Sequence, residues 1–121
     1  MRIAVIPGDG IGRDVTAEAV KVLTAATNKS GRALELVHLP WSADHLIATG
    51  ETLPADGYRM LRDDFAAVLV GALGDPRIPD NRHARDILLG TRFELDLYVN
   101  YRPVRLIDDR LCPLKDRTRK D

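Results

Sequence analysis

Two short runs of uniformly apolar residues constrain the fold of this chain more than any other feature. The first covers residues 3–6 (Ile-Ala-Val-Ile), and the second covers residues 66–70 (Ala-Ala-Val-Leu-Val). Strands that are covered on both faces have continuous apolar sequences of this kind, which are typical of parallel sheets packed between helices. A third strand is predicted at 33–39, where apolar and polar residues alternate.

Helices are predicted between these strands. Residues 15–26 suit an amphipathic helix whose inward stripe consists of Val15, Ala19, Val22 and Leu23. A short helix is expected after Ser42, which can cap its start, and Gly50 ends it. Residues 54–62 suit a further helix with Leu61 turned inward. Strands that alternate with helices predict an α/β fold, with a parallel sheet, flanking helices and right-handed crossovers.

The segment 86–106 changes its sequence period partway, from a short helix at 87–95 to a strand at 97–102. Arg92 and Arg102 lie on either side of that change. A turn near residues 94–96 would bring together two side chains that would point in different directions on one straight helix. Because a guanidinium grips a carboxylate with two parallel hydrogen bonds, two converging arginines suit a ligand with two carboxylates. The alternative is that each arginine is an ordinary surface or ion-pair residue.

Two glycine-rich turns follow predicted strands. Residues 8–12 read Gly-Asp-Gly-Ile-Gly, but the dinucleotide-binding fingerprint needs a further glycine where this chain has Arg13. This turn is therefore either a ligand-binding loop or a plain connection between a strand and a helix. Residues 71–76 read Gly-Ala-Leu-Gly-Asp-Pro and follow the carboxyl end of a strand, where parallel sheets bind ligands. The polar residues 76–85 are expected to form a long surface loop.

The balance of charge excludes some classes of protein. The 121 residues contain 18 Lys and Arg against 18 Asp and Glu, and no basic stripe is long enough to follow a nucleic-acid backbone. No apolar run reaches the length of a bilayer, and the run near the N-terminus is too short for a signal peptide. The single cysteine, Cys112, has no internal disulfide partner, which fits a reducing compartment. We expect a cytoplasmic protein that binds neither nucleic acid nor membrane.

Two patterns in 86–106 are specific enough to indicate a family. They are Leu-Leu-x-x-Arg, which ends at Arg92, and Asp-Leu-Tyr-x-Asn-x-Arg-Pro-Val-Arg at 96–105. They resemble the β-decarboxylating dehydrogenases, the family of isocitrate and isopropylmalate dehydrogenases and their tartrate and homoisocitrate relatives. The resemblance implies that Arg92 and Arg102 bind the carboxylates of a 2-hydroxy dicarboxylic acid. Leu88 would pack against its aliphatic substituent, which indicates 3-isopropylmalate and leucine biosynthesis, because a polar residue is expected there for isocitrate.

The turn at 7–12, Pro-Gly-Asp-Gly-Ile-Gly, also resembles the usual opening of this family. Members commonly continue with Pro-Glu where this chain has Arg13 and Asp14, and many have Gly-Gly-Pro in the later turn at 71–76. Tartrate, malate or isocitrate therefore stay open as alternative substrates. In that later turn, the resemblance assigns contacts with the cofactor to Gly71, Gly74, Asp75 and Pro76.

The resemblance implies an oxidation followed by a decarboxylation. A hydride passes to NAD or NADP, the β-keto acid loses carbon dioxide, and a Mg²⁺ or Mn²⁺ ion polarises the hydroxyl oxygen. The catalytic residues, the metal-binding aspartates and most of the dinucleotide site of the family have no counterpart within these residues. We therefore expect a single α/β segment, the N-terminal part of an isopropylmalate dehydrogenase-like fold, inactive alone and homodimeric at full length.

The C-terminal residues 103–121 are expected to begin a second domain, with a short strand at 111–114. The charged tail at 115–121 has no apolar residue, and we expect it to fray. A competing hypothesis belongs to another class of protein. It is a non-catalytic α/β module that binds a small anion, or a remnant that only pairs with another chain.

Overall fold

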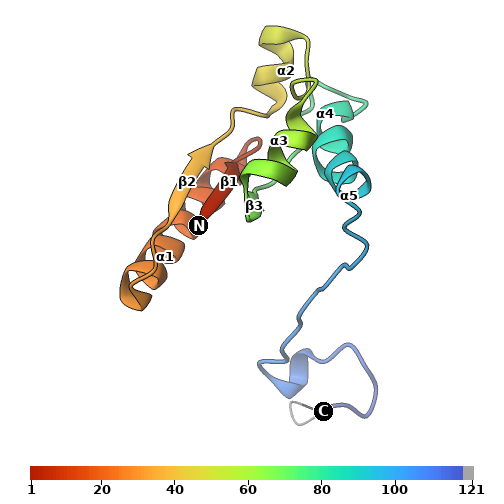
Figure 1. Ribbon diagram of the computed structural model, residues 1–121. Coiled ribbons are helices and arrows are strands. Elements are labelled where there is room, and N and C mark those ends of the chain that lie inside the picture. Colours follow the sequence, from red (N-terminus) through yellow and green to blue (C-terminus); the bar gives the residue numbers. More distant parts are fainter. Residues whose placement is uncertain (119–121) are drawn as a thin grey trace.

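The computed structural model describes residues 1–118 and is built around a parallel β-sheet (Figure 1). Within these residues the sheet has three strands, β1 (Arg2–Ile6), β2 (Glu35–His38) and β3 (Ala67–Val70), in the order β2-β1-β3. Both pairings are parallel, so the carboxyl ends of the strands lie at one edge of the sheet. The predicted α/β class and the strands predicted at 3–6, 33–39 and 66–70 are confirmed.

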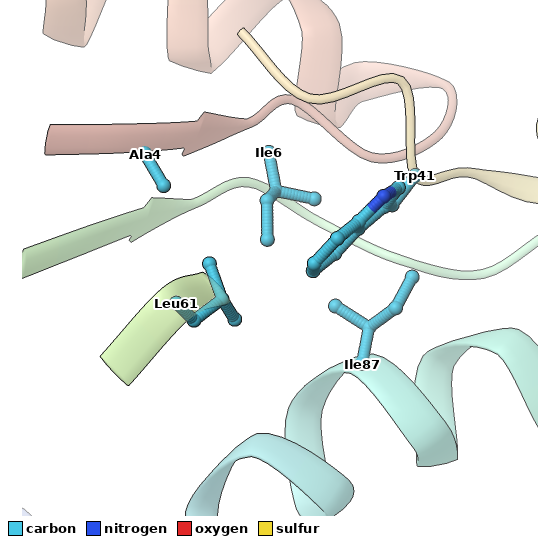
Figure 2. Packing of buried hydrophobic residues seen from close by; sticks show 5 residues of the cluster. All are labelled: Ala4, Ile6, Trp41, Leu61 and Ile87. Carbon is cyan, nitrogen blue, oxygen red and sulfur yellow. The ribbon is translucent and has the colours of Figure 1, made fainter. Parts of the chain in front are cut away.

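Strand β1 is at the centre of the sheet, with a strand on each side, and its apolar side chains are buried in the core. Ala4 and Ile6 have no exposed surface. They pack in one cluster with Trp41, Leu61 and Ile87 (Figure 2). In Figure 2 the side chain of Ile87 points from a helix below the sheet toward the Trp41 ring. The cluster thus joins the first strand to residues from the middle and from the later part of the chain.

Helix α1 (Ile11–Ser30) is longer than predicted and turns a different face to the sheet. Val15 and Val22, which belong to the predicted inward stripe, are 49% and 70% exposed. The prediction of that stripe was therefore wrong for Val15 and Val22, whereas Ala19 and Leu23 are half-buried. The buried residues of α1 are Gly12, Thr16 and Thr27.

A close backbone contact at Gly12 explains the orientation of α1. A Cβ at this position would lie 2.4 Å from the carbonyl oxygen of Ala72 and 2.5 Å from that of Pro7. No side chain fits into such a space, so only glycine lets the start of the helix approach these carbonyls. Thr16, one turn later, lies on the same face of the helix and is buried. Val15 is rotated away from that face.

The next two helices agree closely with their sequence signals. Helix α2 (Ala43–Thr49) begins after Ser42, whose hydroxyl accepts a hydrogen bond of 3.2 Å from the main-chain N–H of His45. It ends at Gly50, which has the left-handed φ of 79° that terminates many helices. Helix α3 (Gly57–Asp64) begins three residues later than predicted, and Leu61 is turned inward as expected.

The chain after β3 is more ordered than predicted. It forms a short helix α4 (Arg82–Ala84), a π-helix η1 (Arg85–Gly90) and a final turn of helix α5 (Thr91–Glu94). The expected surface loop at 76–85 was wrong in part, because Ile78 and His83 are buried. These two side chains are covered where the segment folds back against the body of the protein. The helix predicted at 87–95 is confirmed as the η1–α5 unit.

Beyond α5 the chain leaves the body as an extended segment (Figure 1). The strand predicted at 97–102 was wrong, because within residues 1–118 this segment has no strand beside it to form a ladder. The strand predicted at 111–114 was also wrong: a 3₁₀ turn, η2 (Asp109–Leu111), ends at Leu111, and residues 112–114 are irregular. Part of the fraying tail falls on residues 119–121, which lie outside the described residues. No helix within the described part of the chain is long and apolar enough to cross a membrane.

Candidate functional site

The carboxylate of Asp9 is the centre of the polar contacts at the carboxyl edge of the sheet. Asp9 is only 4% exposed. Its Oδ1 accepts a hydrogen bond of 2.7 Å from the main-chain N–H of Ala43, and its Oδ2 accepts one of 2.9 Å from the N–H of Gly74. Nε2 of His83 lies 2.8 Å from the same Oδ2. The main-chain N–H of Asp9 donates in turn to Ala72 at 2.8 Å. One side chain therefore ties together the starts of α1 and α2, the turn after β3, and α4.

The imidazole of His83 is fully buried. Because the facing carboxylate of Asp9 is an acceptor, Nε2 carries the hydrogen of this bond and donates it. The other ring nitrogen, Nδ1, is buried and has no hydrogen-bond partner among the described residues. The sequence did not point to this pair, because His83 lies in a polar stretch that is typical of a solvated loop. The available signal was Asp9 itself, an acidic residue between two glycines at the carboxyl end of a strand.

The turn at 71–76 contains one packed glycine and one open glycine. A Cβ on Gly71 would lie 2.1 Å from the carbonyl oxygen of Pro7 and 2.5 Å from the hydroxyl oxygen of Thr16, so protein atoms fill that space. Gly74 has a φ of 157°, and no atom lies within 4 Å of the place of its missing Cβ. The space beside Gly74 is therefore open. The absence of a side chain at Gly71 is explained by packing within the protein.

Asp75, in the same turn, is held by an arginine. Its carboxylate accepts hydrogen bonds of 2.9 Å from the main-chain N–H and from Nε of Arg77, and one of 2.6 Å from Nη2. These bonds hold the pKa of Asp75 at about 2, against an ordinary value of 3.8. Arg77 also reaches Asp44 at 2.6 Å, and Asp44 accepts from Arg13 as well. The two guanidinium groups, that of Arg13 first, lower the pKa of Asp44.

The three residues predicted to bind the substrate line one pocket. Leu88, Arg92 and Arg102 lie on the walls of a cavity of about 650 Å³ between β3, α3 and the η1–α5 unit. Within residues 1–118 neither Arg92 nor Arg102 forms an ion pair. The remaining wall is largely apolar and includes Val68, Val70, Leu95 and Leu97.

A turn after α5 brings the two arginines to this pocket. The main-chain N–H of Leu97 donates a hydrogen bond of 2.8 Å to the carbonyl of Arg92, and Asp96 has a left-handed φ of 54°. The helix therefore ends at the place where a turn was predicted from the change of sequence period, 94–96. Arg102, in the extended residues that follow, also lines the pocket.

The two groups of predicted residues lie on adjoining parts of the protein. Val70, the last residue of β3, lines the pocket of the arginines, and Gly71 begins the turn at the carboxyl edge. None of the residues 71–76 lies on the wall of that pocket. The structure thus places Leu88, Arg92 and Arg102 on one pocket. The turn at 71–76 lies next to this pocket but does not line it.

Residues 1–118 contain no group of three or more His, Cys, Asp or Glu side chains that could hold a metal ion. At the carboxyl edge of the sheet, Asp9, Asp44 and Asp75 accept hydrogen bonds from histidine, arginine or main-chain donors. Mg²⁺ is usually held by one or two carboxylates whose oxygens are free to face the ion, and these three carboxylates are already occupied by hydrogen-bond donors. The residues present do not fit such an ion.

The fold and the site together define an α/β protein with its candidate ligand-binding features at and beside the carboxyl edge of a parallel sheet, the usual place for small-molecule sites. Residues 2–121 match the family described as isocitrate/isopropylmalate dehydrogenase. The chain belongs to this family.

Curated relatives from several bacteria support the assignment. The chain is 45% identical over 117 residues to the 3-isopropylmalate dehydrogenase of Corynebacterium kroppenstedtii, which covers 96% of this chain and 34% of that protein. It is 48% identical over 115 residues to the enzyme of that name from Rhodococcus erythropolis, covering 94% of this chain and 33% of the relative. For the enzyme of that name from Thermobifida fusca the identity is 44% over 114 residues, covering 94% and 32%. The chain thus spans about a third of the length of these relatives.

The Asp9 contacts predict a large loss of stability when the carboxylate is changed. Asp9→Asn replaces one acceptor oxygen by an amide that donates, so the N–H of Gly74 and Nε2–H of His83 lose a shared acceptor in a buried place. We expect the free energy of unfolding in urea to fall by about 2–4 kcal/mol. Asp64→Asn, on the exposed end of α3, should change it by less than about 0.5 kcal/mol. Equal stability of the two variants would contradict the central role of Asp9.

The contact between Asp75 and Arg77 predicts a pH dependence with a definite sign. The pKa of Asp75 is lowered on folding from 3.8 to about 2, so its stabilising contribution is complete above the unfolded value and is lost as the pH falls toward 2. Arg77→Gln should move the pKa of Asp75 back toward 3.8, as followed by the carboxyl carbon shift in an NMR titration. Arg82→Gln, a nearby exposed arginine, is the matched control and should leave that titration unchanged.

Proposed function

We propose that this chain is the N-terminal part of a β-decarboxylating dehydrogenase that oxidises 3-isopropylmalate with NAD. The single observation that carries the proposal is that Arg92 and Arg102, far apart on any straight helix, lie on the wall of one pocket together with Leu88. The names of the curated relatives support the same substrate.

The chemistry of the pocket suits a branched dicarboxylic acid. Two guanidinium groups that make no ion pair with the described residues offer paired donors to two carboxylates. Leu88 and its apolar neighbours Leu95 and Leu97 provide a surface for an aliphatic substituent. A third carboxylate, as in isocitrate, would meet leucine at position 88, where it loses water without gaining a polar partner. Isopropylmalate therefore fits the pocket better than isocitrate.

We assign the turn at 71–76 to the nicotinamide side of the cofactor, with Gly71, Gly74, Asp75 and Pro76 as its residues. The support is the position of the turn next to Val70, which lines the pocket, and the open space beside Gly74. The cofactor, NAD in this proposal with NADP as the alternative, supplies the hydride acceptor. Ligands for Mg²⁺ or Mn²⁺ would come from sequence outside this chain, and the whole enzyme would be a homodimer.

A second candidate function is a non-catalytic α/β module that binds a small anion. The specific observation in its favour is that residues 1–118 hold two arginines on one pocket but no cluster of metal ligands. Such a module would bind a dicarboxylate without transforming it. The two proposed functions predict different results for a longer polypeptide. If the chain is part of the dehydrogenase, the longer polypeptide would have dehydrogenase activity, and if it is a binding module, the longer polypeptide would have none.

Removal of either arginine should weaken ligand binding. In a calorimetric or NMR titration with D-3-isopropylmalate, we expect Arg92→Gln and Arg102→Gln each to raise the Kd by about 10- to 100-fold, because each loses a charged hydrogen-bonded contact of about 1.5–3 kcal/mol. Arg59→Gln, on the exposed face of α3, is the matched control and should leave the Kd unchanged. An unchanged Kd in Arg102→Gln would remove the basis of the proposal.

The chain on its own should not turn over substrate. We expect no formation of NADH from D-3-isopropylmalate, NAD and Mg²⁺, because no described group of side chains can hold the metal ion. The Corynebacterium kroppenstedtii relative, assayed in parallel, serves as the positive control. Measurable turnover by the 121-residue chain would contradict this expectation and would place the missing ligands within it.

A further inference from the structure

Tyr58 lies outside the walls of the pocket but contacts the helix that carries Leu88. Its hydroxyl donates a hydrogen bond of 2.8 Å to the main-chain carbonyl of Asp86, in the first turn of η1. The carboxylate of Asp86 is held as well, because the hydroxyl of Thr52 donates to it at 3.0 Å. Two hydroxyl groups from α3 and the loop before it therefore fasten the start of η1.

Gly90, the last residue of η1, packs against the same hydroxyl. A Cβ at position 90 would lie 2.1 Å from the hydroxyl oxygen of Tyr58 and 2.8 Å from its Cζ. The ring could not keep its place if residue 90 had a side chain. The phenol thus contacts η1 at residue 86 and at residue 90, and Leu88 lies midway between these two contacts.

The shape of η1 makes this support important. A π-helical turn is wider and less favourable than an α-helical one, and such turns are frequent at functional sites. Leu88 lies within the π-helix, and Arg92 follows its last residue by two positions. A small shift or rewinding of η1 would therefore move both side chains relative to the opposite wall of the pocket, which β3 forms.

The hydroxyl group of Tyr58 is suited to donate its hydrogen bond at all pH values near neutrality. Burial first, and then the nearby carboxylates of Asp86 and Glu94, raise the pKa of Tyr58 above its ordinary value of 10. The hydroxyl consequently keeps its hydrogen at neutral pH and donates it to the Asp86 carbonyl.

We propose that Tyr58 is a positioning residue that sets the placement of Leu88 and Arg92 in the pocket and thereby favours dicarboxylates with an aliphatic branch. This inference rests on the proposed function of the pocket. Tyr58 acts through η1 and does not touch the ligand. Position 88 selects the ligand only while the Tyr58–Gly90 contact keeps η1 in its π-helical form.

The first test compares two ligands that differ in the branch. Tyr58→Phe keeps the ring and removes only the hydroxyl, and Tyr98→Phe, whose ring is 85% exposed, is the matched control. Titrations with D-3-isopropylmalate and D-malate should show that Tyr58→Phe lowers the preference for isopropylmalate by about fivefold, the size expected for one net hydrogen bond. Tyr98→Phe should keep the preference of the original chain. An equal weakening of both ligands would overturn the assignment of specificity to Tyr58.

The second test needs no ligand. Amide hydrogen exchange at residues 88–92, followed by NMR, should be about fivefold or more faster in Tyr58→Phe and unchanged in Tyr98→Phe. Gly90→Ala, which displaces the ring, should accelerate exchange in the same residues. Unchanged exchange in both variants would overturn the positioning role, whatever the titrations show. If neither ligand binds the original chain, the proposed function fails, and faster exchange would still support the hold of Tyr58 on η1.

Discussion

The carboxylate of Asp9 is the interaction on which the carboxyl edge of the sheet depends. A buried charge is costly unless hydrogen bonds replace its water, and here the donors are Ala43, Gly74 and His83. A side chain as short as aspartate reaches all three because a parallel sheet brings the ends of its strands to one edge. The start of α2, the turn at 71–76 and α4 are thus held together by one residue in the first turn of the chain.

Sequence patterns of a few adjacent residues predicted the helices and strands of the fold well. They did not predict the contacts between segments that are distant in the sequence. Ser42 and Gly50 mark the ends of α2 because capping is a local property. The rotation of α1 depends on the approach of Gly12 to the carbonyl of Ala72, and no periodicity along the helix contains that information. The expected strand at 97–102 failed for a related reason, since a strand requires a neighbour as well as a suitable sequence.

In the candidate site, too, features set by nearby residues could be predicted from the sequence, and contacts between distant residues could not. A shared site for Arg92 and Arg102 could be predicted, because the change of sequence period and the turn that it implies lie between them, and both residues line one pocket. The pair of Asp9 and His83 could not, since the two residues are 74 positions apart and His83 lies among polar neighbours that suggest solvent. Tyr58 was missed because its role lies in a hydroxyl contact with a main-chain carbonyl, which leaves no pattern in the sequence.

The extended residues after α5 have a consequence for handling the protein. Tyr98, Val99, Tyr101 and Val104 are between 71% and 93% exposed, in a sequence rich in residues that favour strands. Such a segment is a template for intermolecular pairing, because its unpaired main-chain N–H and C=O groups can bond to those of a second copy. We therefore expect aggregation of the isolated polypeptide to begin at these residues, before the packed interior unfolds.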